Sequence, residues 1–130
     1  MNPEVPLSPQ SKALIQALTS GLPLREQGVV LELPPLVENG NLVEVTVRAE
    51  SPMTASSHVK AIHLVSGGNP SPLILSARFT PANGLAVLKT RIRMAESQQV
   101  LALVQDSGGQ WRVGRRQSLV TLSACLEGLI

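Results

Sequence analysis

The 130-residue sequence is almost without aromatic residues: it has no Tyr, one Trp and one Phe. Surfaces that bind single-stranded nucleic acid stack bases on aromatic side chains, and the sequence has too few of these to build one. The net charge of +2 is also too small for a general nucleic-acid-binding surface. The sequence therefore predicts no nucleic acid partner, and it requires a core built from aliphatic residues.

Long apolar runs are absent as well. No stretch of eighteen consecutive apolar residues occurs, so the sequence predicts no membrane insertion. Residues 1–10 have no basic region followed by an apolar run, which a signal peptide requires. Two expectations stay open: a cytoplasmic protein, or a mature form from which a leader was removed and to which a start Met was added.

Cysteine occurs once, at position 125. A single thiol forms no disulfide within its own chain, and it supplies only one of the four ligands of a structural zinc site. Two interpretations of Cys125 stay open. Its thiolate could be a nucleophile that carries a group covalently and presents it to other proteins. Alternatively, Cys125 is a small buried apolar residue, as most free cysteines are.

Groupings of catalytic or metal-binding residues are also missing from the sequence. The two histidines, His58 and His63, are five positions apart on an expected strand, so they point to opposite faces. Neither has a cluster of cysteines or carboxylates near it, and a metal site needs three or four ligands. No acid–base pair or cofactor motif can be found from the spacing. The sequence therefore predicts no metal, no catalytic residue and no enzymatic activity.

What the sequence does contain is mostly alternation of apolar and polar residues, which predicts strands. The exception is residues 8–21, where Ser8 is an N-cap, Pro9 takes the first helical position and Gly21 ends a short helix. Turn signals with Gly, Pro or Asn separate the strands about every 8 to 12 residues. We expect strands at residues 29–33, 43–50, 58–66, 73–80, 88–94, 99–105 and about 110–122.

About seven strands with this spacing predict an all-β fold: an immunoglobulin-like antiparallel β-sandwich with a short N-terminal helix. The length and the hydrophobic content of 43% are those of one globular domain. We divide the chain into an N-terminal segment with the short helix (1–28), the β-sandwich domain (29–122) and a C-terminal cysteine arm (123–130).

Basic residues gather in two places on the expected strands. The first group is Lys89, Arg91 and Arg93, and the second group is Arg112, Arg115 and Arg116. One interpretation is a solvated face on which the charges protect a sheet edge. The other is a surface that attracts anions or docks a partner protein.

Several short segments occur in a characteristic order along the chain. They are 33–41 (LPPLVENGN), 43–47 (VEVTV), 51–54 (SPMT), 59–64 (VKAIHL), 69–70 (NP), 78–84 (RFTPANG), 90–95 (TRIRMA) and 120–122 (VTL). These segments resemble the SoxY family, the sulfur-carrier subunits of the bacterial thiosulfate-oxidation (Sox) system. The resemblance covers roughly residues 19–125 without large gaps.

This resemblance implies an immunoglobulin-like sandwich that pairs with a SoxZ subunit in the periplasm. It implies that Cys125 carries thiosulfate-derived sulfur as a covalent adduct, with no bound cofactor. In the family, the cytochrome SoxAX attaches thiosulfate oxidatively and the thiohydrolase SoxB releases sulfate. In some organisms a sulfane dehydrogenase acts next. The carrier itself catalyses none of these steps.

The segment around Cys125 departs from the family's arm, which reads Gly-Gly-Cys-Gly-Gly. Here the other arm residues are Ser123, Ala124, Leu126, Glu127 and Gly128. Glycine gives an arm slimness and reach, because it lacks a Cβ and has the widest backbone freedom, and Ala124 and Leu126 reduce both. The alternative function is therefore a SoxY-like binding or structural subunit that has lost sulfur carriage.

Overall fold

A computed structural model describes residues 4–121 of the protein, and these residues form one helix, one 3-10 turn and nine strands. Seven of the strands are four to ten residues long, and two have two residues each. The elements are α1 (Pro9–Thr19), β1 (Leu24–Arg25), β2 (Val29–Glu32), β3 (Leu36–Val37), β4 (Val43–Ala49), β5 (Val59–Ser66), β6 (Leu73–Arg78), η1 (Pro81–Asn83), β7 (Ala86–Ile92), β8 (Gln98–Asp106) and β9 (Trp111–Val120).

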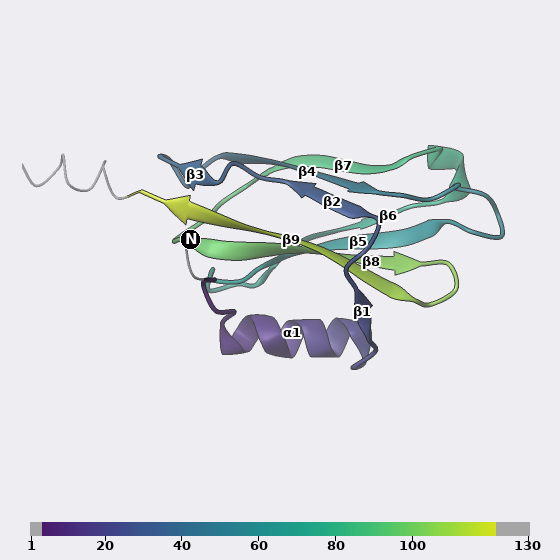
Figure 1. Ribbon diagram of the computed structural model, residues 1–130, viewed down its shortest axis with the longest axis horizontal. Coiled ribbons are helices and arrows are strands. Elements are labelled where there is room, and N and C mark those ends of the chain that lie inside the picture. The colour runs from purple at the N-terminus through teal and green to yellow at the C-terminus, as the bar shows by residue number, and fades with distance from the viewer. Residues whose placement is uncertain (1–3, 122–130) are drawn as a thin grey trace, which may run out of the picture.

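The strands form two sheets that face one another, and α1 lies on the outer side of the larger sheet (Figure 1). The larger sheet has the order β1-β9-β8-β5-β6, with β3 also paired to β9, and the smaller sheet has the order β2-β4-β7. All the longer strands pair antiparallel. The predicted β-sandwich of immunoglobulin type with a short N-terminal helix is thus confirmed.

Apolar side chains fill two layers, one on each face of the larger sheet. Val47 and Ile62 are fully buried in the layer between the two sheets. Leu101 and Leu103 belong to the other layer, which α1 covers with its own apolar side chains. Residues 98–104 of β8 are buried without interruption, because this strand contributes to both layers. β8 is therefore the central strand of the protein.

Helix α1 is fixed to the sheet through its first turn. Ser8 accepts a hydrogen bond from the Ser11 amide through Oγ at 3.1 Å, and Pro9 follows at the first helical position, as the sequence predicts. The Ser11 hydroxyl donates to the Ser66 carbonyl at the end of β5, at 2.5 Å. The Ser8 amide donates to the Gly67 carbonyl at 2.9 Å.

No helix within residues 4–121 is long and apolar enough to cross a membrane.

Two short strands in the larger sheet differ from the sequence prediction. β1 and β3 run parallel to β9, with Leu24 opposite Trp111 and Leu36 opposite Leu119. A two-residue strand shows no alternation along the sequence, and its partner is about 85 residues away in the chain. β9 is consequently paired with a short strand at each of its ends, in addition to its long ladder with β8.

Candidate functional site

The residue that the sequence singles out, Cys125, lies outside the described residues. The same holds for the other predicted arm residues, Ser123, Ala124, Leu126, Glu127 and Gly128. The structure does describe the strand that leads to them, since β9 ends at Val120 and Thr121 follows. The candidate site is therefore built from the end of β9 and the turns around it.

The end of β9 is held by hydrogen bonds to two separate segments. The Thr121 amide donates to the Val37 carbonyl at 2.8 Å, which continues the pairing between β3 and β9 by one residue. The Val120 amide donates to the hydroxyl of Ser97 at 2.8 Å. The positions of Val120 and Thr121, five and four residues before Cys125 in the sequence, are thus fixed by the fold.

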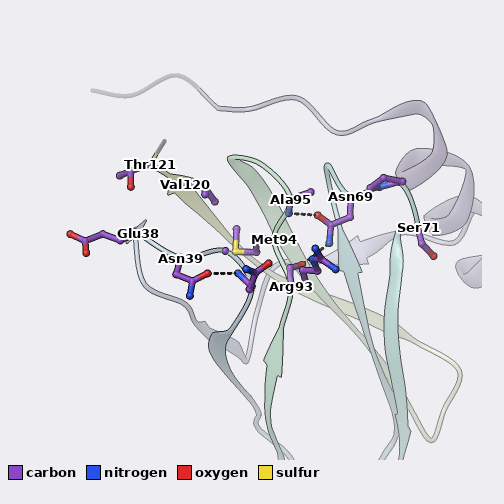
Figure 2. Close-up of a pocket in the computed structure, with 12 residues that line it drawn as sticks. Glu38, Asn39, Asn69, Ser71, Arg93, Met94, Ala95, Val120 and Thr121 are labelled. Carbon is purple, nitrogen blue, oxygen red and sulfur yellow. Dashed lines mark hydrogen bonds between the residues drawn. The ribbon is translucent and has the colours of Figure 1, made fainter. Parts of the chain in front are cut away.

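A groove of about 680 Å³ opens beside this point (Figure 2). Four segments line it: the turn at 38–41, the turn at 69–71, residues 93–95 after β7, and residues 120–121. Each overlaps one of the segments by which the sequence resembles SoxY. The lining residues are Glu38, Asn39, Gly40, Asn41, Asn69, Pro70, Ser71, Arg93, Met94, Ala95, Val120 and Thr121. Residues far apart in the sequence therefore converge where the cysteine segment begins.

One wall of the groove depends on a close approach of Gly40 to Met94. The Met94 amide donates to the Gly40 carbonyl at 2.7 Å. A Cβ atom at position 40 would lie 2.2 Å from the Met94 carbonyl oxygen, which is too close for any side chain. Within the same turn, the Asn39 side chain accepts a hydrogen bond from the Asn41 amide at 3.0 Å through Oδ1. Glycine is therefore required at position 40 for this contact.

The other wall depends on Asn69. Its Nδ2 donates to the Arg93 carbonyl at 2.6 Å, and its Oδ1 accepts from the Ala95 amide at 2.9 Å. The same Oδ1 accepts from Nε2 of Gln98 at 2.8 Å. Gln98 is buried, and its Oε1 accepts a hydrogen bond from the hydroxyl of Ser66. The backbone that carries Arg93 is thus tied to a buried polar network (Figure 2).

Sequence reasoning assigned no role to Asn69 or Gln98. Asn69 belongs to a Gly-Gly-Asn-Pro sequence, which indicates a turn but not which groups its side chain contacts. Gln98 lies at the beginning of β8, and it is 1% exposed. Nothing in the sequence shows that a glutamine there is buried, because the residues that cover it come from other segments.

The first group of predicted basic residues lies along β7, at the edge of the smaller sheet. Lys89 is exposed on the outer face. The Arg91 guanidinium lies 3.8 Å from the carboxylate of Glu44 on β4, and both side chains are well exposed. Arg93 follows the end of β7 and lines the groove. Of the six predicted basic residues, Arg93 is the one that reaches the groove.

The second group lies on β9, in the other sheet. The Arg112 guanidinium makes two hydrogen bonds to the Asp106 carboxylate, at 2.7 and 2.8 Å, and both side chains are largely buried. The Arg115 guanidinium lies 2.6 Å from the carboxylate of Glu26. Arg116 is exposed. Two of the three charges in this group are therefore compensated by nearby carboxylates.

The two histidines lie apart from the groove. His63 is half-buried on the α1 side of β5, where its ring centroid lies 5.8 Å from that of Trp111 and its Nδ1 lies 2.6 Å from the Ser76 hydroxyl. Burial, and secondly the positive charge of Arg78, lower the pKa of His63 below 6.5. His58 precedes β5. Within residues 4–121, no three His, Cys, Asp or Glu side chains are grouped to hold a metal ion.

Comparison with known proteins gives one family. The profile described as "Sulfur oxidation protein SoxY" matches residues 15–125. The solved structure of the sulfur carrier protein SoxY from Chlorobium limicola f thiosulfatophilum is 27% identical in sequence, with a TM-score of 0.71. That comparison covers 86% of this chain and 96% of the Chlorobium chain. No curated protein matches the sequence.

Superoxide reductases are also similar in structure. The superoxide reductase (neelaredoxin) from Ignicoccus hospitalis is 17% identical with a TM-score of 0.64, over 73% of this chain and 81% of that one. The superoxide reductase from Nanoarchaeum equitans is 10% identical with a TM-score of 0.58, over 73% of this chain and 99% of that one. At such identities the likeness shows a shared sandwich fold and nothing about activity.

The SoxY profile and the SoxY structure both extend over most of the chain, whereas the superoxide reductases share the architecture alone. The profile match ends at residue 125, the position of the only cysteine. The chain belongs to the SoxY family, a family of sulfur carrier proteins.

Proposed function

We propose that this chain holds thiosulfate-derived sulfur covalently on Cys125 and presents it to partner enzymes in the periplasm, while its sandwich pairs with a SoxZ subunit. The observation that carries the proposal is the SoxY match over residues 15–125, which ends on the only thiol of the chain. The groove at the end of β9 supports it, because SoxY-like segments gather there next to the beginning of the cysteine segment.

The position of Thr121 limits where the thiol can act. Four residues lead from Thr121 to Cys125, and an extended chain spans at most about 3.6 Å per residue, so the two Cα atoms lie within about 14 Å of each other. Thr121, from which this limit is counted, is itself anchored to β3 and lines the groove. A thiol that is joined to an anchored residue by a short stretch of chain suits the transfer of a sulfur group between the active sites of partner enzymes.

The carrier contributes a thiolate and no other reacting group. In attachment, one S–S bond forms between Sγ of Cys125 and the outer sulfur of thiosulfate, and two electrons pass to a cytochrome partner of the SoxAX type. The product, Cys–S–S–SO3⁻, keeps one negative charge. A SoxB-type thiohydrolase then adds water, releasing sulfate and two protons and leaving a cysteine persulfide. A sulfane dehydrogenase is the expected partner for that remaining sulfur.

Intact-mass measurement of the protein from its native source tests the proposal. A carrier should show mass additions of sulfur or thiosulfate that a thiol reductant removes, and Cys125→Ser should abolish them. A reducible adduct that persists in the Cys125→Ser variant would contradict the assignment. Co-expression with a SoxZ subunit should give a stable heterodimer, and a chain that stays monomeric beside that subunit would contradict the pairing.

The second candidate is a SoxY-like binding or structural subunit whose arm no longer carries sulfur. Ser123, Ala124, Leu126 and Glu127 stand where the family has glycine, and this favours it. Titration of the free thiol in the native complex separates the two candidates. A carrier should have a Cys125 that an alkylating reagent such as iodoacetamide labels in the folded protein, whereas a purely structural subunit should leave the thiol inert.

A further inference from the structure

Arg93 gives the groove a positive charge that is not compensated within the described part of the chain. Among residues 4–121, Arg48, Arg91, Arg112 and Arg115 each have a carboxylate within 4.0 Å, whereas no such carboxylate is found beside Arg93. The other charged residue of the lining is Glu38, whose carboxylate points away from Arg93 (Figure 2). One wall of the groove therefore presents a free guanidinium.

The fold holds the backbone that carries this guanidinium in a defined place. The backbone carbonyl of Arg93 accepts from Asn69, and the next amide, that of Met94, donates to Gly40. A cation on a fixed backbone loses less conformational freedom when it binds an anion than a cation on a mobile loop. The side chains of Asn41 and Ser71 add neutral polar groups to the same lining.

We propose that the groove is a binding site for the anionic end of sulfur oxyanions, with Arg93 as its charged contact. The ligand class is a sulfonate-type group, –SO3⁻, either on the group attached to Cys125 or on a reagent that approaches the thiol. A guanidinium matches such an oxyanion in charge and in hydrogen-bond geometry. The inference rests on the proposed role of Cys125 as the carrier thiol. It adds the place where the charge of the cargo is recognised.

Distances allow this arrangement. Thr121 lines the groove, and Cys125 lies within about 14 Å of it by chain length alone. The groove, at about 680 Å³, has room for a sulfonate group. An anion held by Arg93 while its sulfur meets the Cys125 thiolate has its charge partly neutralised. This matters because the thiolate and the reagent otherwise repel each other.

The reaction with tetrathionate tests the site directly. The Cys125 thiolate attacks an inner sulfur of tetrathionate, forming Cys–S–S–SO3⁻ and releasing thiosulfate, so no external oxidant is needed. Tetrathionate is a dianion with a sulfonate at each end, and iodoacetamide is a neutral reagent for the same thiol. Because the chain has one cysteine, intact mass reports both reactions at Cys125.

The experiment compares the 130-residue chain with Arg93→Gln, Arg93→Lys and the control Arg48→Gln, in low-salt buffer. Arg48 is an exposed arginine paired with Glu32, outside the groove. Arg93→Gln should slow the tetrathionate reaction about fivefold and leave the iodoacetamide rate unchanged, as expected for one lost charge at short range. Arg93→Lys should keep most of the rate, and Arg48→Gln should keep all of it. High salt should reduce the difference between wild type and Arg93→Gln.

Two results would overturn the inference. Equal tetrathionate rates for wild type and Arg93→Gln would show that Arg93 does not meet the anion. Equal slowing of both reagents in Arg93→Gln would show a change in thiol exposure and not in anion binding. If neither tetrathionate nor iodoacetamide labelled Cys125 in the folded wild type, the carrier proposal would fail instead. Fluorescence of the single Trp confirms that each variant is folded.

Discussion

Replacing Gly40 with Ala should destabilise the protein and distort the groove. The added Cβ would lie 2.2 Å from the Met94 carbonyl oxygen, so the turn at 38–41 must move away from the end of β7. Forcing extra atoms into such a contact costs about 1–3 kcal/mol. Losing the hydrogen bond from Met94 to Gly40 adds about 1 kcal/mol, and the lower entropy of the unfolded Ala chain offsets about 0.5 kcal/mol. We expect a net loss of about 1.5–3.5 kcal/mol.

Urea unfolding monitored through Trp111 measures this loss, since Trp111 is the only Trp and is buried. The matched control is Gly108→Ala, because a Cβ at position 108 meets no atom within 4 Å. The control should change the free energy of unfolding by less than about 0.5 kcal/mol. If Gly40→Ala were as stable as Gly108→Ala, the close approach of the turn to Met94 would not be the constraint we describe.

Three further predictions concern the sandwich. Leu103→Ala should lower the free energy of unfolding by about 2–5 kcal/mol, because Leu103 is fully buried on the central strand; a loss below 1 kcal/mol in urea unfolding would contradict that position. Asp106→Ala should cost about 2 kcal/mol, because it leaves the largely buried guanidinium of Arg112 without its carboxylate; an unchanged urea midpoint would show that the pair adds no stability. His63 should make the protein less stable as the pH falls below 6.5. In the unfolded chain, His63 then takes up a proton. In the folded protein its pKa is lowered, so it takes up that proton only at lower pH, and protonation favours the unfolded chain. His63→Gln should flatten the pH dependence of the urea midpoint between pH 7.5 and 5.5, and an unchanged slope would assign that dependence to other groups.

The parts of the fold with a strong local pattern could be predicted from the sequence. The expected strand at 43–50 begins where β4 begins and ends one residue later than β4, and this agreement follows from the strict alternation of its apolar and polar residues. The helix follows from Ser8 and Pro9. β1 and β3 could not be predicted, since two residues define no period and their partner strand is distant in sequence.

The groove could not be predicted as a site, although its parts are visible in the sequence. The turn at 38–41, the turn at 69–71 and Arg93 each have a local explanation, but their meeting depends on the order of the strands in space. The sequence also does not show which of the basic residues are paired with a carboxylate and which line the groove. Arg112 and Arg93 are indistinguishable as sequence letters, yet one is paired with Asp106 and the other lines the groove. Cys125 stays a prediction from position and family.

The pairing of β9 also has a mechanical consequence. β9 forms a continuous ladder with β8 from Gln105 opposite Trp111 to Gln98 opposite Ser118, and β3 pairs with its last two residues. A pull on the chain beyond Thr121, directed along β9, runs along these strands, perpendicular to the hydrogen bonds between β8 and β9 and across the slanted bonds between β3 and β9. The bonds then bear the load together in shear, and the strand does not peel away one bond at a time. A partner that pulls on the chain after Thr121 therefore meets high resistance at the end of β9, and the sandwich stays folded under this load.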